Sequence, residues 1–202
     1  MHYLVGLERL GYEAYYVEAH ARTPSMLMTS ETDDGSALAA EYIANVMRRF
    51  GMSDRWAFHA LHDDGRVYGM DAEALDALYR DAALIINYHG GTLPLQEHTA
   101  TGRLLYLGTD PVDIEIEVAE GRRETIDFLA QHCGFYTWGL NLGRPDCRVP
   151  VPAPFDFKPM PPVVVRDLWD TPPHDRCGQQ RQHLGVRPRG YARLAPGALV
   201  RA

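Results

Sequence analysis

The sequence lacks long apolar segments and secretory features, and it contains only three cysteines. No apolar run approaches the roughly 18 residues that a membrane-spanning helix needs, so we expect no membrane span. The start lacks a basic segment followed by an apolar stretch and a small-residue cleavage site, which argues against a signal peptide. Cys133, Cys147 and Cys177 are too few and too scattered for a disulfide framework. These absences predict a cytoplasmic protein.

Common cofactor and metal fingerprints are also absent. Neither GxGxxG nor GxxxxGK[ST] occurs, so the usual dinucleotide and P-loop motifs are missing. His59 and His62 lie three residues apart beside Asp63 and Asp64, but no third ligand follows at a recognisable spacing. A solvated turn explains this cluster better than a metal site, and we expect neither a metal nor a cofactor.

Charge is distributed unevenly along the chain. The net charge is −7, yet residues 171–202 hold six arginines and a single acidic residue, Asp175. The remaining chain is therefore acidic, and we expect it to bind no nucleic acid. Residues 171–202 also lack apolar periodicity, so burial cannot offset the entropy cost of ordering them, and the sequence predicts a disordered basic tail.

Helical and strand patterns alternate along the rest of the chain, and 46% of the residues of the whole chain are hydrophobic, enough for a buried core. Apolar periodicity and capping residues predict helices over His2–Leu10, Ala37–Phe50, Ala72–Arg80, Ile114–Ala119 and Glu124–His132. Apolar runs of strand length predict strands over Tyr12–Val17, Arg55–Leu61, Ala82–Tyr88, Arg103–Gly108 and Gly134–Gly139. Continuous rather than alternating apolarity is typical of strands in a parallel sheet. The fold class is therefore α/β, with a doubly wound, mostly parallel sheet.

The sequence divides into three parts. Residues 1–143 form a Rossmann-like domain, residues 144–170 form a Pro-rich linker with a final strand over Val163–Trp169, and residues 171–202 form the tail. The domain opens on a helix followed by a strand, which is the second half of a β-α-β unit. We expect the first strand of this unit to be missing and to leave an exposed sheet edge that is open to self-association.

Three segments carry a resemblance to a known family. They are the start His2–Glu18, with HYLVGLERLGYEAYYVE, the segment Leu105–Val112, with YLGTDPV, and the segment Thr137–Pro152, with WGLNLGRPDC. They resemble bacterial glycosyltransferase-like proteins of the double-Rossmann (GT-B) type, over roughly residues 2–169. The resemblance implies an N-terminal, acceptor-side half, with a nucleotide-sugar donor and an unknown acceptor as partners of the intact protein.

Two departures from that family bear on activity. The Gly-rich turn that precedes the first helix in the family is absent, and the Arg- and Pro-rich tail stands where a second, donor-binding domain would follow Trp169. A tail of this composition is typical of a shifted reading frame in a GC-rich gene. We therefore expect a truncated or frameshifted product that is inactive alone. The alternative is a non-catalytic α/β binding or interaction domain.

Residues that directly follow the strands are the candidate site residues, because ligands of doubly wound sheets bind beyond the carboxyl ends of the strands. His89 and Asp110 are the candidate catalytic residues, as a base for an acceptor hydroxyl and as the residue that orients it. The candidate ligand-binding residues are His20, Asn87, Gly90, Gly91, Thr92, Thr109 and Asn141.

Each candidate also has a structural explanation. The glycines after His89 can simply make a sharp turn that leaves the histidine on the surface, and Asp110 can cap the next helix with Pro111 at its first position. Glu18 and His20 can form a solvated pair at the start of a loop. Asn141 lies where a hinge would be. We expect Cys133, next to a strand, to be a buried thiol.

Overall fold

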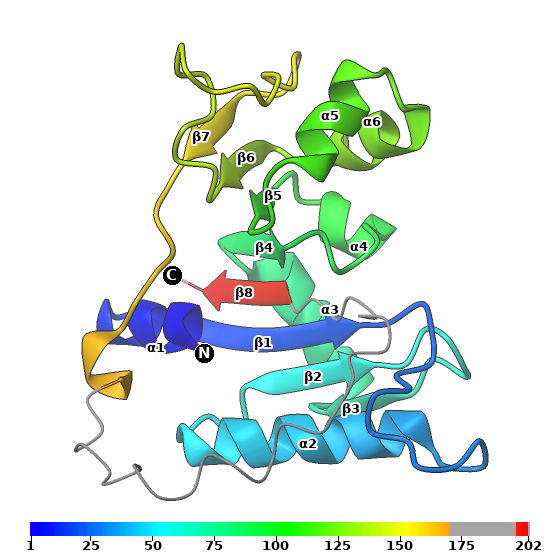
Figure 1. Cartoon of the computed structure of the whole chain (residues 1–202). Helices are drawn as coiled ribbons and strands as arrows, with labels where there is room; N and C mark the ends of the chain where they lie inside the picture. The colour runs from blue at the N-terminus through cyan, green and yellow to red at the C-terminus, as the bar shows by residue number, and fades with distance from the viewer. Residues whose placement is uncertain (170–196, 202) are drawn as a thin grey trace, which may run out of the picture.

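The apolar runs of the sequence form the middle of one sheet. The computed structural model describes residues 1–169 and 197–201. Its strands are β1 (Glu13–Ala19), β2 (Trp56–His59), β3 (Val67–Gly69), β4 (Leu84–Tyr88), β5 (Leu104–Gly108), β6 (Gly134–Thr137), β7 (Phe157–Pro159) and β8 (Gly197–Arg201). They lie in the order β3-β2-β1-β8-β4-β5-β6-β7, and Figure 1 shows β8 crossing the middle of the sheet between β1 and β4.

Most strand pairs are parallel. The four strands β4, β5, β6 and β7 form an all-parallel block, and β1 pairs parallel with β2. Two strands run the other way: β3 pairs antiparallel with β2, and β8 is antiparallel to both β1 and β4. The predicted α/β class with a mostly parallel sheet is confirmed, and the parallel block is consistent with a Rossmann-like fold.

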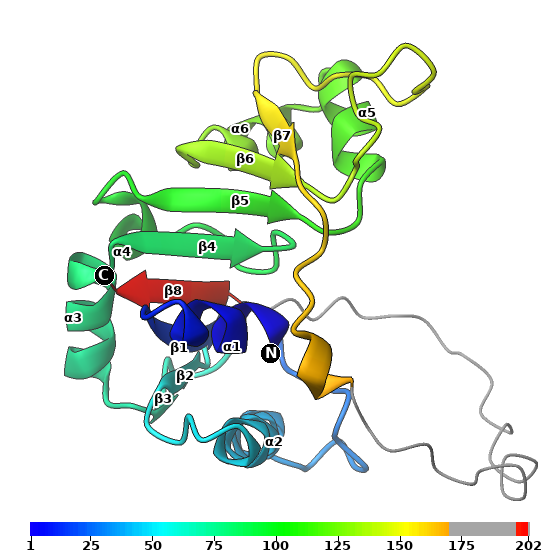
Figure 2. The same cartoon turned by 90° about the vertical axis from the view of Figure 1, so that its left-hand side faces the viewer.

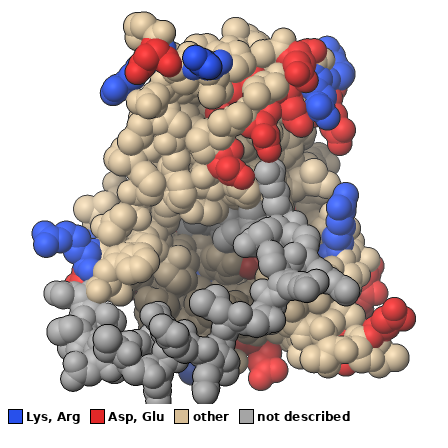
Figure 3. Space-filling view, in the orientation of Figure 1, with Lys and Arg blue, Asp and Glu red and all other residues tan. Residues whose placement is uncertain are grey.

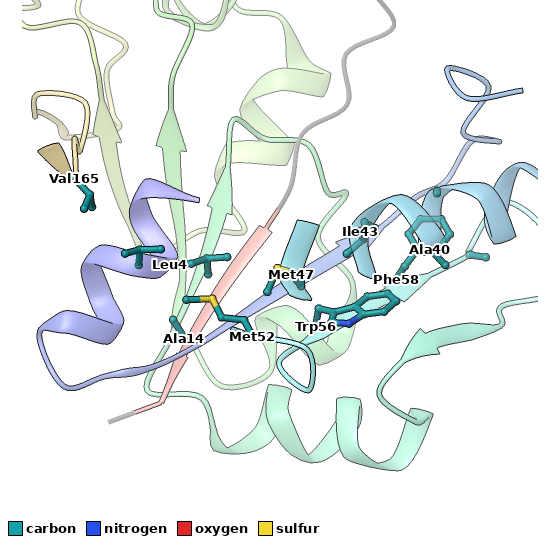
Figure 4. Packing of buried hydrophobic residues seen from close by; sticks show 12 residues of the cluster. Leu4, Ala14, Ala40, Ile43, Met47, Met52, Trp56, Phe58 and Val165 are labelled. Atoms are coloured by element: carbon teal, nitrogen blue, oxygen red, sulfur yellow. The ribbon is translucent and has the colours of Figure 1, made fainter. Parts of the chain in front are cut away.

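Helices cover both faces of the sheet (Figures 1 and 2). They are α1 (His2–Arg9), α2 (Gly35–Arg49), α3 (Ala72–Asp81), α4 (Gln96–Thr99), α5 (Asp113–Ala119) and α6 (Arg123–Leu129), and a 3₁₀ turn, η1, spans Arg166–Leu168. Leu4 of α1 and Met47 of α2 pack with Phe58 of β2 on one face (Figure 4). On the other face, Leu75 of α3 packs with Val17 of β1. Each such fully buried side chain contributes about 1.5–3 kcal/mol to folding.

Local signals place several helix ends correctly. Gly11, which follows α1, has φ +88°, the left-handed conformation expected of a helix C-cap glycine. Asp71 caps α3 by accepting a hydrogen bond from the Ala74 N–H at 2.7 Å. Helix α2 begins at Gly35, two residues earlier than predicted, because Asp34 accepts the N–H of Ala37 and fixes the start.

The predicted final strand over Val163–Trp169 is wrong. A Cβ on Gly6 of α1 would lie within van der Waals distance of the Val163 and Val165 side chains, and Val165 is buried in the same core cluster as Leu4 and Val5 of α1. The Val165 N–H also donates to the His2 ring nitrogen Nδ1 at 3.1 Å. These β-branched residues therefore pack on a helix instead of pairing in the sheet. The strand of this Pro-rich region is β7, which adds to the edge of the sheet beside β6.

The prediction of a disordered tail is wrong for residues 197–201, because they form β8. The other residues of the predicted tail, 171–196 and 202, lie outside the described residues. The predicted exposed edge next to β1 is also wrong, because Glu13–Val17 pair with β8 on that side. Self-association stays a prediction. Within the described residues, no helix combines the length and the apolarity needed to cross a membrane.

Candidate functional site

A polar pocket of about 220 Å³ lies at the carboxyl ends of β4 and β5. It is lined by His89, Gly90, Gly91, Tyr106, Asp110, Asp113, Ile114 and Phe128. Four of these, His89, Gly90, Gly91 and Asp110, are candidates from the sequence, so the fold brings two predicted strand-end clusters together. The position agrees with the general rule for ligand sites in open α/β sheets.

His89 adopts an unusual backbone conformation at the end of β4. Its φ is +63°, which non-glycine residues rarely adopt. Two contacts hold His89 in this conformation. The His89 N–H donates to the Leu107 carbonyl oxygen of β5 at 2.7 Å, and the His89 Nδ1 lies 2.7 Å from the hydroxyl of Thr109, the residue after β5. Such strained positions concentrate at functional sites. Thr109 thus acts on the pocket through His89, whose ring it orients.

Gly90 has little room for a side chain. Its φ is +66°, and a Cβ there would lie 3.1 Å from the Tyr106 ring and 3.3 Å from the Phe128 ring. These two rings meet edge to face, with centroids 6.0 Å apart, and they also line the pocket. A glycine lets the backbone pass close to the aromatic rings and keeps the pocket open.

Asp110 does not cap the helix that follows it. Helix α5 starts at Asp113 with Val112 at its N-cap, and the Val112 N–H donates to the Glu115 carboxylate at 2.7 Å. The capping alternative is therefore wrong, and both Asp110 and Asp113 line the pocket.

The pocket is acidic. Among residues 1–169 and 197–201, its lining contains two carboxylates and no lysine or arginine. Acidic side chains, with some arginines, also gather over α5 and α6 (Figure 3). This negative charge disfavours phosphate groups. It is compatible with neutral, hydroxyl-rich ligands, because carboxylates accept hydrogen bonds from hydroxyl groups.

Asn87 and Thr92 have a structural role instead of lining the polar pocket. The Asn87 side chain is buried, its Nδ2 donates to the Thr92 carbonyl oxygen at 2.9 Å, and it lies 3.1 Å from Nε2 of the buried His132. His132 Nδ1 lies 3.1 Å from the Phe128 carbonyl oxygen, so Nδ1 donates there and Nε2 accepts from Asn87. Burial lowers the pKa of His132 to about 4, which keeps the ring neutral.

His20 lies at the end of β1, outside the polar pocket. Its Nε2 is 2.7 Å from a Glu18 carboxylate oxygen, and the two side chains are only 9% and 14% exposed. The alternative of a solvated pair is therefore wrong. The Tyr16 hydroxyl also donates to Glu18, and the pKa of Tyr16 is raised, first by burial and then by the Glu18 charge. The polar groups at this strand end bind one another.

The remaining candidates are dispersed. Asn141 is exposed outside the pocket, and its carbonyl oxygen accepts the Arg144 N–H at 3.0 Å. Cys133 is exposed, so the expected buried thiol is wrong. His62 Nε2 lies 2.9 Å from the buried Ser36 hydroxyl. Among residues 1–169 and 197–201, no group of three or more His, Cys, Asp or Glu side chains is arranged to hold a metal ion.

Sequence reasoning missed part of the pocket lining. Asp113 stands three residues after Asp110 in the segment TDPVD, and this second carboxylate was a signal that could have been used. Tyr106 and Phe128 gave no such signal, because an aromatic residue in a strand or a helix has the same pattern whether it lines a pocket or fills a core.

Comparisons of the chain with protein-family models, with curated proteins and with solved structures gave no match. The resemblance to GT-B glycosyltransferase-like proteins therefore stays a prediction.

Proposed function

We propose that the polar pocket binds the hydroxyl groups of a sugar-like acceptor, and that His89 is the general base of a glycosyl transfer. The observation that carries this proposal is the conformation of His89, which is held at φ +63° beside Thr109 in a pocket with two carboxylates. When Nδ1 donates its proton to Thr109, Nε2 is the basic nitrogen, and a neutral imidazole is suited to accept a hydroxyl proton near pH 7.

The same pocket is a poor site for the diphosphate of a sugar donor. Stabilisation of a departing diphosphate requires positive charge or backbone N–H groups, and the part of the lining that the structure describes supplies two carboxylates and no cationic side chain. The chain thus fits the acceptor-side, Rossmann-like half of a GT-B protein, with the donor bound by another domain. We expect this chain alone to bind acceptors without transferring sugar.

The proposal is tested by titrating the ¹⁵N-labelled full chain with neutral methyl glycosides, and separately with UDP and UDP-glucose, by NMR. We expect saturable shifts of the Gly90 and Gly91 amides with at least one methyl glycoside and none with UDP. The variants His89→Asn, in which asparagine tolerates the left-handed conformation, and Asp110→Asn should weaken binding roughly tenfold each, the effect of losing one charged or strong hydrogen bond.

The control is Asn141→Ala, which changes an exposed side chain outside the pocket. Unchanged sugar affinity in His89→Asn and Asp110→Asn would exclude this pocket as the binding site. Measurable transfer from UDP-glucose to an acceptor by the purified chain would overturn the assignment as an acceptor-side half only.

One observation favours the alternative of a non-catalytic interaction domain. An apolar cavity of about 380 Å³ lies between α1 and the sheet, lined by residues that include Leu7, Leu84, Ile86 and Leu107. If no methyl glycoside binds while an apolar peptide does, the interaction domain is the better description.

A further inference from the structure

The apolar cavity between α1 and the sheet has the size of a small-molecule site. Its volume is about 380 Å³, and ligand pockets in proteins usually measure about 300–1,000 Å³. Leu84 and Ile86 of β4 line it from the sheet, and Leu7 lines it from α1. The segment that follows β7 lines a third side through Val163, and Figure 2 shows this segment running past the strand ends to η1, beside α1.

Contacts outside the cavity fix two of these walls to each other. Arg9, the last residue of α1, donates two hydrogen bonds of 2.7 and 2.6 Å to the Asp167 carboxylate of η1. At the other end of the helix, His2 Nδ1 accepts the Val165 N–H at 3.1 Å, and the His2 ring stacks on Trp169. Both ends of α1 are thus tied to the segment after β7, so the cavity is preformed, as most small-molecule sites are.

The lining favours a hydrocarbon chain over a peptide. Among the described residues, Tyr3 and Tyr136 are the polar side chains in the lining. The strands β4, β5 and β6 have a neighbouring strand on each side, so they present no free sheet edge to a peptide. Peptide groups in this cavity would lose their hydrogen bonds to water without replacement, which is costly. A chain of CH₂ groups loses no hydrogen bonds and gains from burial.

The cavity is elongated, and one of its ends is polar. Leu84 is the first residue of β4 and lies at the amino end of the strands. Leu107 pairs in register with Tyr88, four residues beyond Leu84, so the lining extends about 13 Å along the strands. Tyr136 is the register partner of Leu107 on the other side, so its phenol lies at the carboxyl end of the cavity.

Lys158 brings a positive charge to the polar end. It is the only lysine of the chain and the register partner of Tyr136, and register partners in parallel strands place their side chains on the same face. Lys158 is exposed, and within the described part of the chain it forms no ion pair, not even with the nearby Asp156. The Tyr3 hydroxyl accepts the Trp138 Nε1–H at 3.0 Å and keeps its own proton for donation. A cation and hydroxyl donors at one end of an apolar cavity suit an anionic head group.

We propose that this cavity binds one molecule of a fatty carboxylate, an unbranched hydrocarbon chain with a carboxylate head group. The chain lies between α1 and the sheet with its end near Leu84, and the carboxylate pairs with Lys158 and accepts the hydrogen bond of the Tyr136 hydroxyl. The site is separate from the polar pocket, because Tyr106 of that pocket and Leu107 of this cavity are neighbours in β5 and face opposite sides of the sheet. The inference is independent of sugar binding.

The single lysine makes a binding test specific to this site. Reductive methylation of the full chain with ¹³C-formaldehyde labels Lys158 and the Met1 amino group, and it keeps the lysine charge. Titration with decanoate and dodecanoate below their micelle concentrations should produce a saturable NMR shift of the Lys158 methyl signal. Calorimetry should show that each added CH₂ group tightens binding about fourfold until the cavity is full. Dodecyltrimethylammonium, which has the same chain and a cationic head, should not bind.

Two variants separate the contributions of the head group and the chain. Lys158→Gln should weaken dodecanoate binding roughly tenfold, the effect of losing one charged hydrogen bond, and should leave the binding of dodecanol unchanged. The matched control Arg49→Gln removes a positive charge from an exposed position of α2 and should change neither affinity. Leu105→Trp fills part of the cavity and should weaken both ligands, with circular dichroism as the check of its fold.

Four outcomes would overturn the proposal. No carboxylate shifts the Lys158 methyl signal, or affinity does not depend on chain length. Lys158→Gln, which changes only an exposed side chain, binds dodecanoate as tightly as the unchanged chain. An apolar peptide binds where every carboxylate fails, which would make the cavity part of a protein interface. The chain binds phosphatidylglycerol vesicles but no free carboxylate, which would make this surface a membrane contact.

Discussion

The two halves of the sheet, on either side of β8, use the same kinds of polar residue in opposite ways. At the ends of β1 and β2, His20 pairs with Glu18 and His62 pairs with Ser36. At the ends of β4 and β5, His89 and Asp110 line a pocket. The difference lies in the backbone, because two glycines after β4 keep space open. A histidine at a strand end is therefore a site candidate only where the adjacent chain leaves room for a ligand.

The largest contrast should come from the aromatic residues beneath each strand end. Phe58 is fully buried and contacts His20 edge to face, whereas Phe128 lines the polar pocket. We expect Phe58→Ala to lower the free energy of unfolding by about 3–5 kcal/mol, the cost of a large buried cavity, and Phe128→Ala by about 1–2 kcal/mol. Urea denaturation measures both, and equal losses would show that the two strand ends are packed alike.

The pH dependence of stability should be located in the half that contains His132. Burial lowers its pKa to about 4 in the folded state, against about 6.5 unfolded, so the unfolded state binds the proton more tightly. The stabilisation is complete above pH 6.5 and is lost as the pH falls toward 4, by on the order of 2–3 kcal/mol. Burial also lowers the pKa of His98, which adds a loss of the same sign.

Urea denaturation between pH 4 and 7 tests this origin. In His132→Gln, where the side-chain oxygen can still accept from Asn87, the decrease in stability with falling pH should shrink to the part that His98 contributes. An unchanged slope in that variant would assign the pH dependence to other groups.

A smaller difference in stability is expected between alanine substitutions at two glycines, Gly90 and Gly51, and it separates the cost of backbone strain from the cost of lack of space. Gly90 and Gly51 both have positive φ, but a Cβ at Gly51 would meet no atom within 4 Å. Gly51→Ala should cost about 1 kcal/mol, from the left-handed conformation alone. Gly90→Ala should cost about 2 kcal/mol and also weaken glycoside binding, because its Cβ presses on Tyr106 and Phe128. Thermal unfolding of the two variants measures the difference, and identical costs would mean that the rings move aside freely.

The smallest contrast compares the buried contact between Glu18 and His20 with the pocket histidine, His89. Glu18→Gln removes the charge next to His20 while it keeps hydrogen-bonding atoms, and we expect a loss of about 1–2 kcal/mol of stability. His89→Asn should change stability by less than about 1 kcal/mol, one hydrogen bond, yet weaken glycoside binding. If Glu18→Gln weakens glycoside binding and His89→Asn lowers only stability, the end of β1 is the binding site.

The sequence predicted local features well and long-range features poorly. The strands at Leu84–Tyr88 and Leu104–Gly108 and the Asp71 cap depend on neighbouring residues, and the structure has them where the pattern indicates. The Val163–Trp169 strand failed because strand propensity does not say whether a β-branched residue pairs in a sheet or packs on α1. The prediction of a disordered tail failed at residues 197–201 for a different reason: the strand partners of β8 lie far away in the sequence, so no local pattern indicates the pairing.

The sequence indicated the strand ends at which the polar pocket lies, but not which side chains line it. The rule for strand ends indicated His89, Gly90, Gly91 and Asp110, and the structure has all four in the lining of the polar pocket, while their part in binding stays a prediction. It could not separate them from Asn87, which is buried and bound to Thr92 and His132, because burial depends on how α6 packs on the sheet. Sequence pattern gives the strand end, and only tertiary packing decides which side chains face a cavity.

The central place of β8 has a consequence for folding on the ribosome. Glu13 pairs with Arg201, so β1, which is synthesised much earlier, cannot complete the middle of the sheet until residues 197–201 have emerged. Contacts of such sequence separation slow folding, because the loop between the partners must close before any pairing stabilises it. Until then β1 and β4 each have one edge of unpaired backbone groups. The nascent chain is therefore prone to aggregation for as long as residues 197–201 have not emerged.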